Sequence, residues 1–100
     1  MRFVIKCVSE DGYDFPDIID YTELFPGSSA ISNLPNPKSV RVTLPWGIGT
    51  FTFGEYVVNV IFEYHSIDFG YTEPLIEQLS DSISKYTGKP TKWYQVPSRN

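Results

Sequence analysis

The chain has 100 residues, 41% of them hydrophobic and 16% aromatic, which is enough apolar material for one ordinary domain and leaves no room for a second independent core. Twelve acidic and eight basic residues give a formal net charge of -4, which argues against nucleic acid as the primary ligand because phosphate binding needs a concentrated basic face. The single cysteine, Cys7, excludes an internal disulfide, so the composition does not indicate an oxidising compartment.

Neither the N-terminus nor the longest apolar stretch predicts membrane insertion. Residues 1–8 contain only a three-residue apolar run before Lys6, which is too short for the core of a signal peptide. The stretch 56–62 is interrupted by Asn59 and is far shorter than the roughly 20 residues that a membrane span needs. We therefore expect a cytoplasmic protein that does not enter a membrane.

The first third of the chain predicts a strand, a short helix or turn, and a long loop. Residues 2–8 are rich in β-branched and aromatic types and lead into the turn signal Glu10-Asp11-Gly12, which favours an opening strand. Residues 13–25 leave two interpretations open, a short helix capped by Asp14 or an extended segment, and we prefer the short helix or turn. Residues 26–38 are dense in Pro, Gly, Ser and Asn, which predicts a long loop.

The middle of the chain predicts three strands. The first covers 39–44 and ends at Pro45, the second covers 48–53, and Gly54-Glu55 make a two-residue turn into the third, 56–64. Alternation with period two divides the third strand into two faces. The core face carries Tyr56, Val58, Val60, Phe62 and Tyr64, and the partly covered face carries Val57, Asn59, Ile61, Glu63 and His65.

The prediction is completed by a helix over residues 73–87 and, over 91–96, by a short final strand or an extended tail that covers the sheet. Thr72 is a suitable N-cap, and Gly88 followed by a Lys-Pro pair ends the helix. Its apolar stripe comprises Leu75, Ile76, Leu79, Ile83 and Tyr86. The predicted fold is α+β in one domain, residues 1–100, with an antiparallel sheet of about four or five strands and this helix packed on one face.

The residues available for catalysis or metal binding are few. One His and one Cys exclude most zinc sites and CxxC redox chemistry. Cys7 lies in the predicted opening strand, where a small buried side chain is ordinary. The run W-G-I-G-T at residues 46–50 lacks the Lys of a phosphate-binding loop and predicts a tight turn or bulge. We therefore expect no catalytic residue, no cofactor and no metal.

His65 is the one candidate for a chemical role. Glu63 and Asp68 are close to it in sequence, and a neighbouring carboxylate can orient or charge an imidazole near neutral pH. A small hydrolase or isomerase that uses His65 with Glu63 or Asp68 is therefore an alternative function. The chain has no G-x-S-x-G motif for such a base to serve, so a rim histidine is the simpler interpretation.

An acidic run occupies residues 10–23, and no Lys or Arg occurs between Lys6 and Lys38. Such runs are usually solvated surface, and a calcium site is a weaker option because the full ligand pattern is missing. The functional interpretation is a surface that docks onto a basic protein, since interfaces combine aromatic anchors with complementary charge. The predicted partner-binding residues are Asp14, Asp17, Asp20 and Glu23 as charge contacts and Tyr13 and Tyr21 as anchors.

A small acidic domain poor in catalytic groups fits a protein-binding module better than an enzyme. The sharpest hypothesis is a bacterial inhibitor or immunity-type protein, an antitoxin, that neutralises a basic partner such as a nuclease toxin, because proteins that bind phosphates present a positive cleft. The alternative is a structural or assembly subunit, in which the partly covered face with Val57 and Ile61 pairs with a second copy or with another chain.

Overall fold

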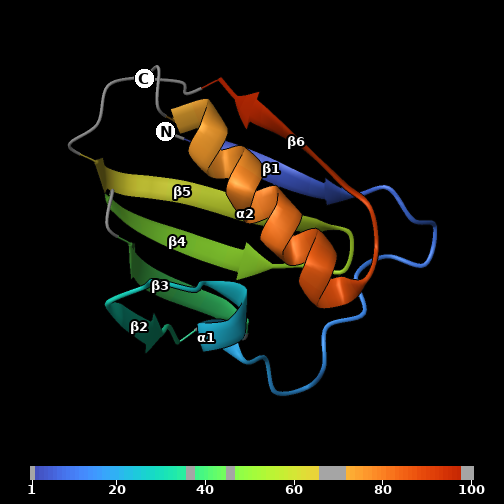
Figure 1. Ribbon diagram of the computed structural model, residues 1–100, viewed down its shortest axis with the longest axis horizontal. Helices are drawn as coiled ribbons and strands as arrows, with labels where there is room; N and C mark the ends of the chain where they lie inside the picture. Colours follow the sequence, from blue (N-terminus) through green and yellow to red (C-terminus); the bar gives the residue numbers. More distant parts are fainter. Residues whose placement is uncertain (1, 36–37, 45–46, 66–71, 98–100) are drawn as a thin grey trace.

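The computed structural model describes residues 2–35, 38–44, 47–65 and 72–97, apart from the side chains of residues 63–65 and 72. These residues form a six-stranded antiparallel sheet with one long helix across one face (Figure 1). The predicted α+β class is confirmed, with a slightly higher strand count than expected. In chain order the elements are β1 (Arg2–Cys7), α1 (Tyr21–Leu24), β2 (Ala30–Asn33), β3 (Ser39–Leu44), β4 (Gly47–Phe53), β5 (Val57–His65), α2 (Thr72–Thr87) and β6 (Thr91–Val96).

The strand order is β2-β3-β4-β5-β1-β6. Strands β2 to β5 form a meander, and the first strand of the chain then pairs with β5 on one side and with β6 on the other. Because β5 and β6 are both antiparallel to β1, they run parallel to each other. A parallel connection needs a crossover, and α2 supplies it by passing over the sheet (Figure 1).

The core lies between the sheet and α2. Alternate residues of β1, β3, β4 and β5 point to this side and are buried, and the apolar stripe of α2 packs onto them. The prediction for α2 is confirmed, because Ile76, Leu79 and Ile83 are buried while Glu77 and Gln78 are exposed. The largest fully buried side chains are Phe3, Phe25, Phe51, Ile5, Leu24, Ile76, Ile83, Val40, Val42, Val58 and Val60.

The C-terminal end of α2 leads directly into β6. Gly88 has a φ of 72°, and its N–H donates to the Ser84 carbonyl at 2.8 Å, which is the left-handed stop that glycine favours. Ser80 of α2 is buried, and its hydroxyl lies 2.6 Å from the hydroxyl of Thr91 at the start of β6. These contacts fix the outer strand against the helix, so the predicted final strand is confirmed.

The pattern on β5 is confirmed for Val58, Val60 and Phe62, which are all buried. The prediction is wrong for Tyr56, which is 45% exposed. Tyr56 precedes the first residue of β5, and its hydroxyl lies 3.5 Å from the Glu10 carbonyl oxygen, so it belongs to the loops at the end of the strand. Tyr64 is among the residues whose side chains are outside the described set.

The predicted bulge near the W-G-I-G-T run occurs where the register between β4 and β5 shifts, between Ile48 and Gly49. A Cβ atom on Gly49 would lie 2.9 Å from the ring of Phe51 and 3.2 Å from that of Phe62. The glycine therefore allows two phenylalanine rings to pack against the strand backbone. Trp46 lies outside the described residues.

The prediction of an uninterrupted loop over 26–38 is wrong. Residues 30–33 form the edge strand β2, which pairs with β3 from Ala30 opposite Thr43 to Asn33 opposite Val40. Three of its four residues are exposed, so this strand is held by backbone pairing and gives no hydrophobic signal in the sequence. Pro26, Gly27 and Pro35 lie on either side of β2, while Ser32 and Asn33, which also predicted a loop, lie within it. Among the described residues, no helix is long and apolar enough to cross a membrane.

Candidate protein-binding surface

A buried tyrosine, Tyr13, lies in the connection between β1 and α1. The Tyr13 side chain is 7% exposed, its N–H donates to the Glu55 carbonyl at 2.6 Å, and its hydroxyl donates to the Ile5 carbonyl at 3.1 Å. Burial, with a smaller contribution from the nearby Cys7, raises the pKa of the Tyr13 phenol well above its ordinary value. Tyr13 therefore ties this connection to β1 and to the turn before β5.

Aromatic rings hold the rest of the connection against β4. The centroid of Phe15 lies 5.2 Å from that of Phe53, the Tyr21 ring lies 5.7 Å from the same residue, and the Phe25 ring lies 4.5 Å from Phe51. Such pairs contribute about 0.5–1.5 kcal/mol each beyond the burial of their area. The segment between β1 and β2 is therefore a packed part of the molecule, although it contains only one turn of helix.

That turn, α1, depends on Asp20. One carboxylate oxygen, Oδ1, accepts hydrogen bonds from the Thr22 hydroxyl at 2.6 Å, the Thr22 N–H at 3.1 Å and the Glu23 N–H at 3.3 Å. These bonds, the Thr22 hydroxyl foremost, hold the pKa of the Asp20 carboxyl below its ordinary value. The Asp20 N–H donates to the Tyr86 hydroxyl at 3.0 Å, so the N-cap of α1 is also fastened to α2.

The side chains between these anchors project into solvent. Within residues 14–23, which we call the acidic segment, Asp14, Asp17, Asp20 and Glu23 are all exposed. Ile18, which lies between Asp17 and Asp20 in the chain, is 88% exposed. The acidic segment lies on the same side of the sheet as α2, below the C-terminal half of that helix in Figure 1. It therefore exposes both negative charge and one large apolar side chain to solvent.

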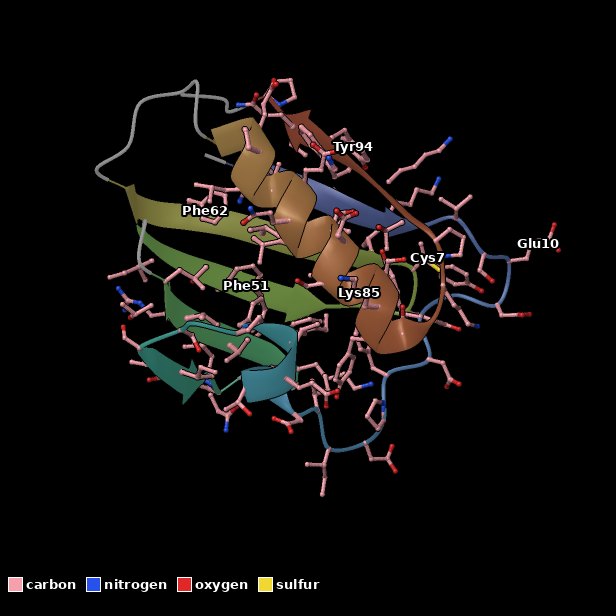
Figure 2. The ribbon with its side chains drawn as sticks, in the orientation of Figure 1. Cys7, Glu10, Phe51, Phe62, Lys85 and Tyr94 are labelled. Atoms are coloured by element: carbon pink, nitrogen blue, oxygen red, sulfur yellow. The ribbon has the colours of Figure 1, made fainter. Side chains whose placement is uncertain are left out.

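One basic side chain borders the acidic segment. Lys85 of α2 and Glu23 of α1 both line a hollow of about 300 Å³ between the two helices, together with Pro26, Ser82 and Tyr86. In Figure 2 the labelled Lys85 lies on α2, on the side facing the reader. The sequence has no Lys or Arg between Lys6 and Lys38. No basic residue close in sequence therefore balances the negative charge of the acidic segment.

The acidic run seen in the sequence divides into two parts in the structure. Glu10 and Asp11 sit in a separate loop that follows β1, and the labelled Glu10 lies at the outer end of that loop in Figure 2. A carboxylate oxygen of Asp11 lies 3.9 Å from the ammonium of Lys89. This loop turns at Gly12, where φ is 71° and a Cβ atom would lie 2.6 Å from the Glu55 carbonyl oxygen. Glu10 and Asp11 are therefore not part of the acidic segment.

The predicted anchors differ from the expectation. Tyr13 is buried, so its side chain is not accessible to a partner. Tyr21 is half-buried, and burial, followed by the neighbouring Tyr86, raises the pKa of its phenol. The exposed apolar residue is instead Ile18, which sequence reasoning missed. Two isoleucines stand side by side at 18 and 19, and no periodicity in this segment indicates which one is buried.

The residues that the sequence suggested for catalysis or metal binding do not form a site among the described residues. Asp68 and the side chains of Glu63 and His65 lie outside the described set. Cys7 is free and buried in β1, as expected. Within the described residues, no group of three or more His, Cys, Asp or Glu side chains is arranged to hold a metal ion.

Comparisons with protein-family models, curated proteins and solved structures found no match to this chain.

Proposed function

We propose that this chain is a protein-binding module of the inhibitor or immunity type, which neutralises a basic partner such as a nuclease toxin through the acidic segment. The observation that carries the proposal is the exposure of four carboxylates and of Ile18, which is 88% exposed, within one ten-residue segment that is fastened to the core. A nuclease holds phosphates in a positive cleft, and a preformed acidic surface competes for such a cleft.

The environment of each residue in the acidic segment indicates what it would contribute to binding. Asp14, Asp17 and Glu23 supply charge, which accelerates encounter with a basic surface and selects against acidic ones. Ile18 supplies the apolar contact on which affinity depends. Asp20 has its Oδ1 oxygen engaged in capping α1, so it contributes its charge to the surface while its main role is to shape it. Because the connection is already ordered by Tyr13 and Phe15, little ordering entropy is lost on binding.

The test is an affinity pull-down from source-cell lysate at low and moderate salt with three baits. The first is the wild type, the second carries Asp14→Asn, Asp17→Asn and Glu23→Gln, and the third is a matched control on α2. The control carries Glu73→Gln, Glu77→Gln and Asp81→Asn, which alters the same number of exposed carboxylates and the net charge by the same amount. Asp20 is unchanged in all three, so α1 keeps its cap.

We expect a basic protein to be captured by the wild type and by the α2 control and to be lost with the acidic-segment variant. A fourth bait, Ile18→Ser, should hold the same protein at least tenfold more weakly, as expected for an apolar contact in an interface. Equal capture by all three baits, or no capture by any of them while circular dichroism shows that they are folded, would reject the proposal.

A further inference from the structure

The sheet face turned away from α2 has a different charge from the rest of the molecule. We call it the open face, made by the side chains of β1, β3, β4, β5 and β6 that alternate with the core residues. In β1 it carries Arg2, Val4 and Lys6, and in β6 it carries Lys92, Tyr94 and Val96. None of the open-face side chains that the structure describes is acidic, whereas the whole chain has twelve acids and eight bases. Glu63 of β5, which the period-two pattern assigns to the same face, has its side chain outside the described set.

The cations on the open face are placed by the register of the strands. Lys6 lies opposite Lys92 in the β1 and β6 pair. A row across the sheet runs from Arg41 through Thr50 and Ile61 to Arg2. With a rise of about 3.3 Å per residue, Arg2 lies about 13 Å along β1 from Lys6, and three strand spacings of about 4.8 Å place it about 14 Å from Arg41. The positive charge is therefore spread over the width of the sheet.

The Lys6 and Lys92 pair is unfavourable in the free protein. Like charges directly opposite each other on adjacent strands destabilise a sheet, and both side chains are exposed. Neither lysine, nor Arg2, forms an ion pair with any residue in the described ranges. An anion bound between the two ammonium groups would remove this repulsion.

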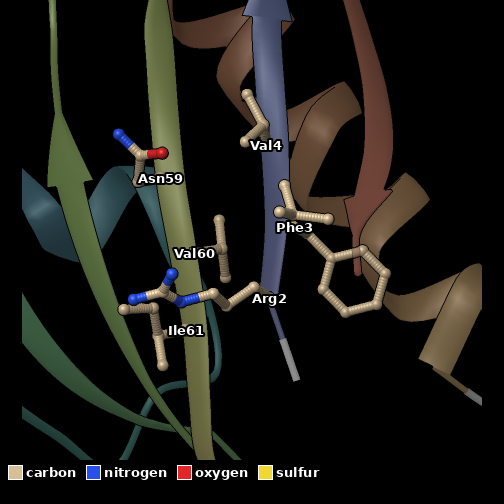
Figure 3. A pocket seen from close by; sticks show the side chains of 7 residues that line it. Arg2, Phe3, Val4, Asn59, Val60 and Ile61 are labelled. Carbon is tan, nitrogen blue, oxygen red and sulfur yellow. The ribbon is translucent and has the colours of Figure 1, made fainter. Parts of the chain in front are cut away.

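The open face also has an apolar floor with an aromatic side chain at its edge. A hollow of about 180 Å³ is lined by Val4, Ile61 and Val96 with Asn59 and Arg2 at its rim. In Figure 3 the Arg2 side chain runs from β1 across β5 towards Ile61, while α2 lies behind the sheet. Tyr94 is 51% exposed and lies opposite Val4, beside this hollow.

We propose that the open face binds single-stranded nucleic acid. Arg2, Lys6 and Lys92 provide cations for successive phosphates, and Tyr94 provides a ring on which a base stacks, which is how proteins hold single strands without reading their sequence. Asn59 adjoins the hollow and both donates and accepts hydrogen bonds. Tyr94 favours nucleic acid over an acidic peptide, because bases have π-faces and carboxylate side chains do not. This inference is independent of the proposed function, which uses the other side of the molecule.

This proposal departs from the expectation drawn from the net charge, because it rests on the local distribution of charge on the open face. The net charge of -4 predicts that nucleic acid is repelled at long range, and this lowers the affinity. Screening shortens that repulsion to about 10 Å at 0.1 M salt, while contacts on the open face act at hydrogen-bond distance. We therefore expect weak binding that depends on salt and on a small number of named residues.

The experiment is fluorescence anisotropy with labelled mixed-sequence RNA and DNA strands of about 12 nucleotides, measured between about 50 and 200 mM salt. One variant carries Lys6→Gln and Lys92→Gln, and another carries Tyr94→Ala. The matched control carries Lys38→Gln and Lys85→Gln, which removes the same charge from exposed positions outside the open face. Urea unfolding of each variant checks that it is folded.

We expect Lys6→Gln with Lys92→Gln to weaken binding roughly tenfold at low salt and to reduce the slope of log K against log salt by about 1.4, as two lost phosphate contacts require. Tyr94→Ala should weaken binding roughly 5- to 100-fold, and the control should stay within about twofold. Tighter binding of RNA than of DNA would assign a contact to the 2′-hydroxyl.

Three results would overturn this inference. They are no binding of either strand at the lowest salt, an equal loss in the lysine variant and its control, and displacement of the strand by a glutamate peptide of equal charge at equal concentration. The acidic-segment variant should bind the strands at least as tightly as the wild type, because it removes negative charge. A failure of this inference is therefore distinct from a failure of the proposed function.

Discussion

The hydroxyl of Tyr13 is a polar group held inside the core, where it donates a hydrogen bond to the carbonyl of Ile5, 3.1 Å away. We expect Tyr13→Phe to lower the free energy of unfolding by about 1 kcal/mol at neutral pH, the usual value of such a hydrogen bond. Urea unfolding followed by circular dichroism measures the difference. Tyr94→Phe, at a side chain 51% exposed, serves as the control and should leave stability unchanged.

The same side chain gives a prediction at high pH. Burial raises the pKa of Tyr13 above 10.0, its value in an unfolded chain, so the unfolded state loses this proton first as the pH rises. The stability contributed by Tyr13 is therefore complete below pH 10 and declines above it. The stability difference between the wild type and Tyr13→Phe should shrink above pH 10, and a constant difference would show that the phenol is not protected.

At the residue scale, the sequence predicts exposure where a pattern exists and fails where none does. Val58, Val60 and Phe62 alternate along a strand, so their burial could be read in advance. Tyr13 and Ile18 lie in a connection without a period. Tyr13 is buried through hydrogen bonds to the Glu55 and Ile5 carbonyls, which the local sequence does not indicate. Composition alone favours a tyrosine over an isoleucine at a surface, and here the structure reverses that order.

At the scale of elements, α1 is a single turn that depends on its cap. Asp20→Ala removes the acceptor for two backbone N–H groups and should lower the melting temperature and speed amide exchange at Thr22 and Glu23. Asp20→Asn keeps an acceptor and should retain most of the protection. Because the pKa of Asp20 is lowered in the folded state, its contribution is present above the ordinary carboxyl range and is lost as the pH falls through it. Equal exchange rates in both variants would contradict this role.

The pairing of β1 with β6 gives a prediction of opposite sign, an increase in stability. Lys92→Glu converts the repulsion across from Lys6 into an attraction and should raise the free energy of unfolding by about 0.2–1 kcal/mol at low salt. The gain should diminish in high salt, since exposed charges are screened. Lys38→Glu changes the net charge equally and should give no gain. A loss of stability in Lys92→Glu would mean that the two side chains do not face each other.

The helices and strands differ in how accurately they can be predicted from the sequence. Helix α2 and strand β5 carry strong periodic patterns and clear ends, because each buries one face against the other, and both were predicted within one residue at each end. In strand β2 only Ile31 is partly buried against the core, and the strand pairs with β3 through its backbone. A strand of that kind leaves no trace in hydrophobicity, and its flanking prolines and glycines point to a loop.

At the scale of the whole molecule, neither the strand order nor the distribution of charge was predictable. The class followed from one long helix and several short strands, but the insertion of β1 between β5 and β6 depends on pairings between residues more than fifty positions apart. The candidate site was predicted in part, since the exposure of Asp14, Asp17 and Glu23 is as expected. The cations of β1 and β6 meet on one face only through that strand order.

The separation of charge between the two sides of the sheet has a consequence for how the molecule meets any charged boundary. The acidic segment lies on the α2 side of the sheet, and Arg2, Lys6 and Lys92 lie on the other side, so we expect an electric dipole along the sheet normal that does not depend on the net charge. Near an anionic surface the molecule will turn its open face inward, and near a cationic one it will present the acidic segment. The protein is therefore expected to adsorb in two opposite orientations, each of which leaves the other face available to solution.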